Sequence, residues 1–264
     1  MKLMTLNTHS LVCDDGNASA KVLADLICRE RIDLVALQEV NQPGNERIIN
    51  TFNPKAVGFS LKNGNYMQKV LENLSKNSHN YTGMWYGFKE SYGRLEEGVG
   101  IITRFPVNEA KTIILSSDKE RQKWKKRCAL GIKTPFGDFF STHMGWWADN
   151  EEPFSEQWGR LASAVEGKKT WILGDFNSES IKTNEGYDMV ISSGFYDTFR
   201  LAEQRDSGYT VCERIDGWNS RKNRRIDYIF CNFPAKIKYS GVICDGSKYP
   251  VISDHFGVII EADA

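Results

Sequence analysis

Apolar positions follow two different periods along the chain, and the change from one to the other predicts the order of its elements. Residues 3–6 form a short apolar run, and residues 33–40 form a continuous one that is typical of a strand buried on both faces. Between them, residues 17–30 carry apolar side chains at helical spacing, with Asn17 as the expected N-cap. This opening predicts a β-α-β unit.

The rest of the chain predicts mostly strands, in an order without an internal break. Helical spacing recurs in residues 66–75 and 154–165, and residues 135–137 mark a hairpin turn. We expect one domain over residues 1–264, of mixed α/β type with two sheets packed together and helices outside. The predicted strands are 81–88, 99–103, 111–115, 128–133, 139–142, 170–173, 226–231 and 256–261.

The composition is that of a soluble globular protein and narrows the class of partner. Hydrophobic residues are 41% and charged residues 26% of the chain, and the formal net charge is zero. A neutral total gives no overall field that attracts DNA or an acidic membrane surface, although a local basic cleft is compatible with it. No apolar run approaches the roughly 18 residues of a membrane span, and the N-terminus lacks a signal-peptide core. We therefore expect a cytoplasmic protein without a membrane partner.

The six cysteines form no C-x-x-C pair, so the sequence indicates neither a zinc ribbon nor a redox motif. Their even number permits a disulfide framework. At this chain length and density we expect reduced, mostly buried thiols instead.

Residues that bind metals or move protons stand at the ends of several predicted strands. Each cluster alone is weak, because a strand-terminal glutamate is usually solvated and an Asp-x-Asn sequence commonly makes an Asx turn. A single histidine is likewise more often a packed side chain than a catalyst. The argument depends on their order and combination. The clusters are Leu6-Asn7-Thr8-His9, Gln38-Glu39-Val40, Ser141-Thr142-His143-Met144, Gly174-Asp175-Phe176-Asn177, Arg225-Ile226-Asp227-Tyr228 and Ser253-Asp254-His255.

With these motifs the chain resembles the endonuclease/exonuclease/phosphatase superfamily of pancreatic-type deoxyribonucleases, abasic-site endonucleases, neutral sphingomyelinases and inositol-phosphate phosphatases. The resemblance implies a four-layered α/β sandwich, with two packed mixed sheets flanked by helices and the active site where their loops meet. It also implies a phosphoester hydrolase that uses Mg²⁺ or Mn²⁺. The matching motifs, in the family's order, are L-N-T, Q-E-V, G-V-G-I-I-T-R-F-P, S-T-H, G-D-F-N, R-I-D-Y-I and S-D-H.

The resemblance assigns the metal to Asn7, Glu39 and Asp254. The family counterpart of Glu39 binds the ion, and Asn7 and Asp254 would complete its inner or water-mediated shell. Oxygen ligands of this kind select Mg²⁺ or Mn²⁺. The ion is needed because a phosphoester is anionic and repels hydroxide, so its charge must be neutralised.

The same resemblance gives roles in the reaction to Asp175, Asn177, His255, Asp227 and His143. Asp175 would orient and deprotonate the attacking water, while Asn177, facing the same side in an extended segment, would donate to a phosphoryl oxygen. His255 would contact the phosphate, with Asp227 holding its ring and favouring its protonated form. His143 resembles the second histidine of the deoxyribonuclease and sphingomyelinase branches, whereas abasic-site endonucleases carry a tyrosine there.

Two expectations concern the neighbours of these residues. Asp254 and His255 are adjacent, and a regular strand would send them to opposite faces, so a bend before Phe256 is required. Glu97 either pairs with His143 or is an exposed glutamate.

The acidic, aromatic loop that contains Trp146 and Trp147 is the main indication of the substrate. Tryptophans beside carboxylates suit stacking on a sugar ring and hydrogen bonding to its hydroxyls, and they suit a polyanionic duplex poorly. The equal alternative is that both tryptophans pack the loop against the body. Basic runs at 119–127 and 221–225 favour a nucleic-acid track, but both also fit solvated loops, which we prefer.

We therefore predict a soluble phosphatase that acts on a small phosphorylated metabolite, in particular a sugar phosphate. One alternative is an endo- or exonuclease that hydrolyses nucleic-acid phosphodiesters, and another is an inactive binding module on the same scaffold. The intact catalytic positions disfavour the inactive module. No apolar wedge indicates membrane insertion, which disfavours a secreted sphingomyelinase.

Overall fold

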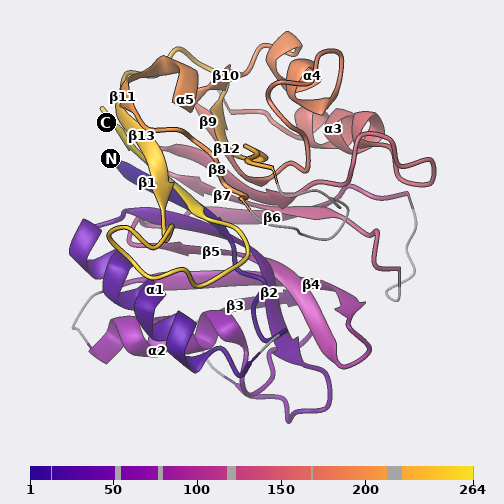
Figure 1. Ribbon diagram of the computed structural model, residues 1–264. Helices are drawn as coiled ribbons and strands as arrows, with labels where there is room; N and C mark the ends of the chain where they lie inside the picture. The colour runs from indigo at the N-terminus through magenta and orange to yellow at the C-terminus, as the bar shows by residue number, and fades with distance from the viewer. Residues whose placement is uncertain are drawn as a thin grey trace.

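Two β-sheets packed face to face form the centre of the computed structural model, and helices cover their outer faces (Figure 1). This is the four-layered α/β sandwich that the sequence predicted. The structure describes residues 1–12, 14–50, 55–76, 80–117, 123–167, 169–212 and 222–263.

The larger sheet has eight strands in the order β11-β13-β14-β1-β2-β5-β4-β3. The first strand of the chain lies inside this sheet, where β1 pairs parallel with β2 and antiparallel with β14. The strands are β1 (Lys2–Asn7), β2 (Leu34–Pro43), β3 (Lys55–Gly58), β4 (Thr82–Ser91), β5 (Leu95–Thr103), β11 (Ala202–Arg205), β13 (Ile237–Ile243) and β14 (Gly257–Ala262).

The smaller sheet has six strands in the order β10-β12-β9-β8-β7-β6. The predicted hairpin joins β7 to β8, and β8 then pairs parallel with β9. The strands are β6 (Glu109–Ile114), β7 (Cys128–Thr134), β8 (Gly137–His143), β9 (Thr170–Asp175), β10 (Tyr196–Asp197) and β12 (Asp227–Cys231).

The helices form the two outer layers. Helices α1 and α2 lie together against the eight-stranded sheet, whereas α3 and α4 lie beside the six-stranded sheet (Figure 1). The helices are α1 (Asn17–Glu30), α2 (Tyr66–Lys76), α3 (Phe154–Ser163), α4 (Gly186–Ser192) and the short α5 (Thr198–Leu201).

Three buried apolar clusters fill the three interfaces between these four layers. Val35 contributes to the cluster under α1 and α2, whereas its neighbour Leu34 contributes to the cluster between the two sheets. Leu173 also lies between the sheets, and its neighbour Ile172 faces α3 and α4. Because successive side chains of a strand point to opposite faces, a strand with a cluster on each side has no polar face. This explains the continuous apolar run that predicted β2.

The N-cap prediction at Asn17 is wrong. Helix α1 begins at Asn17, and its cap is Gly16, which has φ of 69° and makes no side-chain capping bond. Glycine suits this position because a Cβ there would lie 2.8 Å from the Leu11 side chain and 2.9 Å from that of Tyr66.

The cysteine prediction is confirmed at three positions, since Cys128, Cys231 and Cys244 are buried free thiols. Within the described ranges, no helix combines the length and the apolar character needed to cross a membrane. The sequence reading missed β3, β10, β11, β13, α4 and α5.

Candidate active site

Strand register brings three of the predicted residues into one row of the six-stranded sheet. His143 ends β8 and is paired with Asp175, which ends β9. Asp175 is paired in turn with Asp227, the first residue of the antiparallel β12. All three side chains are buried. The row therefore places two carboxyl groups and an imidazole side by side where strands β8 and β9 end and β12 begins.

Asn7 links this row to the other sheet. It ends β1 and its Nδ2 donates to Asp175 Oδ2 and to Glu39 Oε1, both at 3.0 Å. Its backbone carbonyl accepts a 2.7 Å bond from Ser253 Oγ, which holds the segment before β14 against β1. Residues far apart in the sequence therefore meet at the end of the cluster between the two sheets.

Glu39 lies in a β-bulge of β2. The register between β2 and β5 shifts between Leu37 and Val40, and Glu39 has φ of 48°. A bulge re-aims a side chain, and strained backbone of this kind gathers at functional sites. Burial opposes ionisation of Glu39, but the hydrogen bond from His9 and the charge of that ring hold the pKa of Glu39 well below its usual range. Glu39 is therefore a fixed negative charge.

His255 and Asp227 form a tight pair, with 2.9 Å between His255 Nδ1 and Asp227 Oδ2. Residues 253–255 form the predicted bend before Phe256, so the chain turns before β14 begins. Burial lowers the pKa of His255, but the carboxylates of Asp227 and Asp175 outweigh it and raise the pKa to about 10. The ring is therefore protonated at neutral pH, as the sequence predicted.

The pKa of Asp175 is raised as well, which for a carboxyl group favours the neutral form. Burial and the charge of Asp227 raise its pKa to about 7, against the lowering effects of His255, Asn177 and Asn7. A carboxyl group that titrates near neutral pH can accept a proton from water far better than an ordinary aspartate.

Asn177 reaches the site by a turn and not by an extended segment, so that part of the prediction is wrong. Its backbone N–H donates to Asp175 Oδ1 at 2.9 Å, and its φ is 46°. This Asx turn is why the two side chains share a side. The Asn177 amide then donates to the carbonyl of Met144 at 2.9 Å and lies 3.2 Å from His143 Nε2.

His143 is electrically different from His255. Burial, reinforced by the charge of Arg127, holds its pKa well below the usual range, so its ring is neutral. The expected pairing with Glu97 is not found, because the Glu97 carboxylate lies 2.9 Å from the Lys89 ammonium. Among the described residues, His143 Nδ1 has no hydrogen-bond partner.

His9 belongs to the site, although the sequence reading gave it no role. Its Nδ1 lies 3.2 Å from Glu39 Oε2 and 3.8 Å from Asp254 Oδ2. The hydrogen bond to Glu39 raises its pKa, and its φ of 41° is a further strained position. The sequence did contain an indication of this role, because His9 is the last residue of the first strand-terminal cluster.

The oxygen donors around Glu39 fit a hard divalent cation. An ionised carboxylate and the partly exposed Asp254 carboxylate are the ligand types that Mg²⁺ and Mn²⁺ prefer. Asn7 turns its Nδ2 toward Glu39, and its Oδ1 accepts from the His9 backbone N–H at 3.2 Å, so this amide would have to rotate to present its oxygen to an ion. A second group, Asp175, Asp227 and His255, has one ligand atom from each within 4.8 Å of the others. There, one ring nitrogen of His255 is already bound to Asp227, so the Glu39 group is the better cation site.

The two predicted substrate tryptophans lie in different environments. Trp147 is half-buried against the cluster beneath α3, with its ring 6.2 Å from that of Phe154. Trp146 is also half-buried, 5.5 Å from the ring of Trp124 and 5.6 Å from the guanidinium of Arg127.

The described arginines of the basic runs 119–127 and 221–225 are not solvated, so that prediction is wrong for Arg127, Arg224 and Arg225. Arg127 and Arg224 are 2% and 3% exposed, and Arg225 forms an ion pair at 2.7 Å inside the protein. The first residues of both runs fall outside the described residues. In the part of these runs that the structure describes, the arginines contribute no open basic track.

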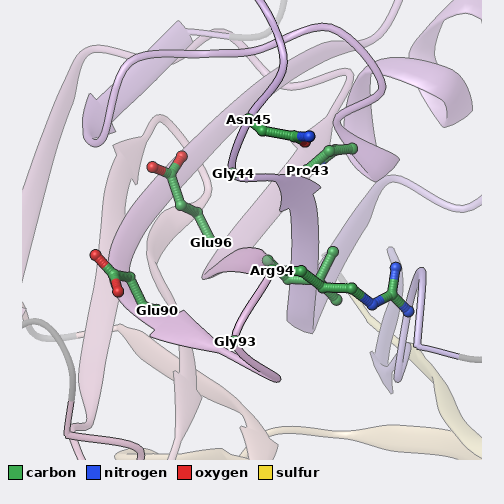
Figure 2. A pocket seen from close by; sticks show the side chains of 8 residues that line it. Pro43, Gly44, Asn45, Glu90, Gly93, Arg94 and Glu96 are labelled. Carbon is green, nitrogen blue, oxygen red and sulfur yellow. The ribbon is translucent and has the colours of Figure 1, made fainter.

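A cavity of about 570 Å³ lies beside the turn between β4 and β5. Figure 2 shows the carboxylates of Glu90 and Glu96 on one side of this turn, while the Arg94 guanidinium points to the other. Arg94 donates to the backbone carbonyls of Leu11 and Val12, which fastens the turn to the loop that follows β1.

The family model of the "Endonuclease/Exonuclease/phosphatase family" matches residues 4–255. A family protein of that description from Leptotrichia buccalis C-1013-b is similar, with 28% identity, a TM-score of 0.90 and 100% of both chains covered. A mannosyl-6-phosphatase from Bacteroides thetaiotaomicron VPI-5482 and a 3'-5' exonuclease from Neisseria meningitidis each show 18% identity over 100% of both chains. Their TM-scores of 0.69 and 0.68 indicate the same fold. No curated protein matches the chain.

Proposed function

We propose that this chain, which belongs to the endonuclease/exonuclease/phosphatase family, is a divalent-metal-dependent phosphatase that releases phosphate from a small phosphorylated sugar such as maltose 6'-phosphate. Members of this family are phosphoester hydrolases and generally require a divalent metal. The proposal adds a monoester substrate and a sugar leaving group.

The observation that carries the proposal is the set of groups around Asp175 Oδ2. Asn7 Nδ2 lies 3.0 Å from this oxygen, His143 Nε2 lies 3.7 Å away and His255 Nε2 lies 3.8 Å away. A buried carboxylate between two imidazoles and an amide is well placed to orient water and take its proton. We assign that role to Asp175.

Two neighbouring donors complete the chemistry. The protonated His255 ring, oriented by Asp227, offers its Nε2–H to a phosphoryl oxygen. The two N–H groups of the Asn177 amide point to the Met144 carbonyl and to His143 Nε2, so Asn177 would donate to a second phosphoryl oxygen by exchanging its bond to His143. Such donors favour the transition state because negative charge on the phosphoryl oxygens is met by fixed dipoles. The neutral His143 holds the Asn177 amide at 3.2 Å.

Asn7, Glu39 and Asp254 would hold Mg²⁺ or Mn²⁺. When bound, the ion neutralises charge on the phosphoryl group. The chain's own contribution is a permanently ionised Glu39 fixed by its bulge and by hydrogen bonds from Asn7 and His9.

A small neutral leaving group is supported by the surroundings of the site. Arg127 and Arg224 are buried, and the loop after β8 carries Asp149, Glu151 and Glu152. Glu152 is buried and bonded to Ser117, and Asp149 and Glu151 share the Lys125 ammonium, so that ammonium is already paired and attracts a polyanionic strand only weakly. The nuclease alternative is supported only by a shared fold, since the Neisseria exonuclease is 18% identical.

The test is phosphate release from maltose 6'-phosphate, mannose 6-phosphate, nucleotides, inositol phosphates and duplex DNA, with Mg²⁺ and with EDTA. We expect release from a sugar phosphate in Mg²⁺, none in EDTA, and intact DNA. Asp175→Asn is the matched inactive control, because it keeps the shape and removes the base. Nicked DNA without released phosphate would refute the phosphatase and favour the nuclease.

A further inference from the structure

Trp124 is the most exposed tryptophan of the described residues, at 56%. A large aromatic ring in water is unfavourable by itself, and single exposed aromatics need no explanation. Trp124 differs because of what holds its backbone.

Two buried cations bind the backbone carbonyl of Trp124. Lys89 Nζ donates to it at 2.9 Å, and Arg127 Nη1 donates to it at 3.0 Å. Lys89 is 5% exposed and pairs with Glu97, itself 3% exposed, at 2.9 Å. The exposed ring is thus attached to a buried ion network.

Burying an ammonium and a guanidinium is costly, and it lowers the pKa of both Lys89 and Arg127. A buried ion pair adds little stability compared with apolar side chains of similar size, but it fixes geometry. Here the geometry that it fixes is the position of Trp124.

Two more contacts hold the same segment from its outer side. Lys125 Nζ lies 3.1 Å from Asp149 and 3.1 Å from Glu151, in the acidic loop after β8. The Trp124 ring lies 5.5 Å from that of Trp146, which belongs to the same loop. The two loops therefore form one rim.

This rim adjoins the catalytic row. Arg127 directly precedes Cys128, and Cys128 is paired with His143 in the β7–β8 ladder. Trp146 follows His143 by three positions. The anchored ring and the row that contains Asp175 are therefore on the same end of the six-stranded sheet.

We propose that the exposed ring of Trp124 is the surface on which the sugar ring of the substrate stacks, with Trp146 packed against it at an interplanar angle of 59° and the Lys125 ammonium 5.6 Å from the centroid of the Trp124 ring. The assignment rests on the proposed sugar phosphatase function. One face of a pyranose ring is lined with C–H groups and packs well on an aromatic ring, while its hydroxyls can reach the carboxylates of the acidic loop. Lys89 and Arg127 are positioning residues for this platform.

The test compares Trp124→Ala with wild type on maltose 6'-phosphate and on glycerol 3-phosphate, which has no ring. We expect KM for maltose 6'-phosphate to rise about tenfold more than KM for glycerol 3-phosphate. Trp124→Phe keeps an aromatic face and should recover most of the selectivity. Phe136→Ala, an exposed aromatic at the opposite end of β7, is the matched control and should leave both substrates unchanged.

A second readout does not depend on turnover of the sugar phosphate. Maltose and inorganic phosphate are each tested as competitive inhibitors of glycerol 3-phosphate hydrolysis. Trp124→Ala should weaken inhibition by maltose and leave inhibition by phosphate nearly the same.

The positioning role is tested with Lys89→Met/Glu97→Gln, which removes the two charges of this pair together. Arg127 keeps its donor bonds to the carbonyls of Trp124 and Lys126. We expect KM for maltose 6'-phosphate to rise while kcat changes little. The single variant Lys89→Arg keeps a donor to the Trp124 carbonyl, so its KM for maltose 6'-phosphate should stay close to that of wild type.

The outcomes separate the two proposals. Hydrolysis of maltose 6'-phosphate with equal KM changes for both substrates in Trp124→Ala would overturn the platform and leave the phosphatase standing. Cleavage of DNA with no sugar phosphate hydrolysed would overturn the phosphatase and, with it, the platform.

Discussion

Asp175 lies between groups of opposite charge, and its protonation depends on both. Asp227 raises its pKa and His255 lowers it, with burial as the larger raising effect. The balance near 7 makes this residue the one whose chemistry responds most to pH.

For Asp175, we expect kcat/KM to rise with pH through about 7 and then level off. The sign follows because the base acts in its deprotonated form, and that form increases as pH rises. Asp175→Asn should lower kcat by roughly 10²- to 10⁴-fold. The measurement is a pH–rate profile on the substrate identified by the panel. A variant that keeps wild-type kcat contradicts the role.

The pair His255–Asp227 predicts the alkaline side of the same profile. His255 donates only while protonated, so activity should fall as pH rises through about 10. Asp227→Asn removes the carboxylate charge that raises the pKa of His255 most, so the fall in activity should move to lower pH. Asp138→Asn, at the opposite end of β8, should not move it. If activity in Asp227→Asn falls at the same alkaline pH as in wild type, His255 is not the group that sets this fall.

The raised pKa of His255 also affects stability. The contribution is fully present below the ordinary histidine pKa of 6.5 and is lost as pH rises through about 10.

Residue identities in this site were predictable from the motifs, but their contacts were not. Asp175 and Asn177 were expected together, yet the sequence cannot show that Asn177 bends back at positive φ. Glu97 was expected either to pair with His143 or to be exposed, and both are wrong, because it is buried and pairs with Lys89 on the neighbouring strand. Such choices depend on register, which no local pattern specifies.

The β-bulge in β2 and the glycine cap of α1 show how local features of single elements position the residues of the site. Without the shift between Leu37 and Val40, Glu39 would follow the regular alternation of the strand. Gly16 lets the loop after β1 close onto α1, since a Cβ there would contact Leu11.

At Gly16, substitution by alanine should destabilise the protein more than the same change at Gly93. Both have positive φ, 69° and 65°, which costs about 1–2 kcal/mol for alanine. Only Gly16 adds a steric clash, because nothing lies within 4 Å of a Cβ at Gly93. Urea denaturation of Gly16→Ala and Gly93→Ala measures the difference. Equal losses would mean that the neighbours of Gly16 move aside freely.

Elements with a strong apolar period were predicted, and weakly patterned elements were not. The run that became β2 is apolar from Leu34 to Leu37 because both faces of the strand are buried there. Strand β13 reads Ile-Lys-Tyr-Ser-Gly-Val-Ile, with exposed Lys238 and Tyr239 and a register shift at its start. Its pairing with β14 and β11, and not its own pattern, makes it a strand.

Periodicity predicted two packed sheets with helices outside, and the family resemblance made this the four-layered sandwich. The reason that periodicity went no further is physical: which sheet a strand joins depends on partners distant in the sequence. β12 joins β9 and β10, while β13, a few residues later, joins β11 and β14.

For the whole chain, we propose a single domain that unfolds in one transition, because the central cluster belongs to both sheets. Leu173→Ala, in that cluster, should lower the free energy of unfolding by about 2–5 kcal/mol and shift the entire transition. Calorimetry and circular dichroism should give the same midpoint. Two separate transitions would show that the sheets are independent units.

The position of β1 inside its sheet has a consequence for synthesis on the ribosome. One edge of β1 pairs with β2, which emerges soon afterwards, but the other edge pairs with β14, made of residues 257–262. Throughout most of translation the nascent chain therefore presents an unpaired strand edge, which is a template for aggregation. Expression yield should consequently depend on chaperones that bind the growing chain more than on the stability of the finished protein.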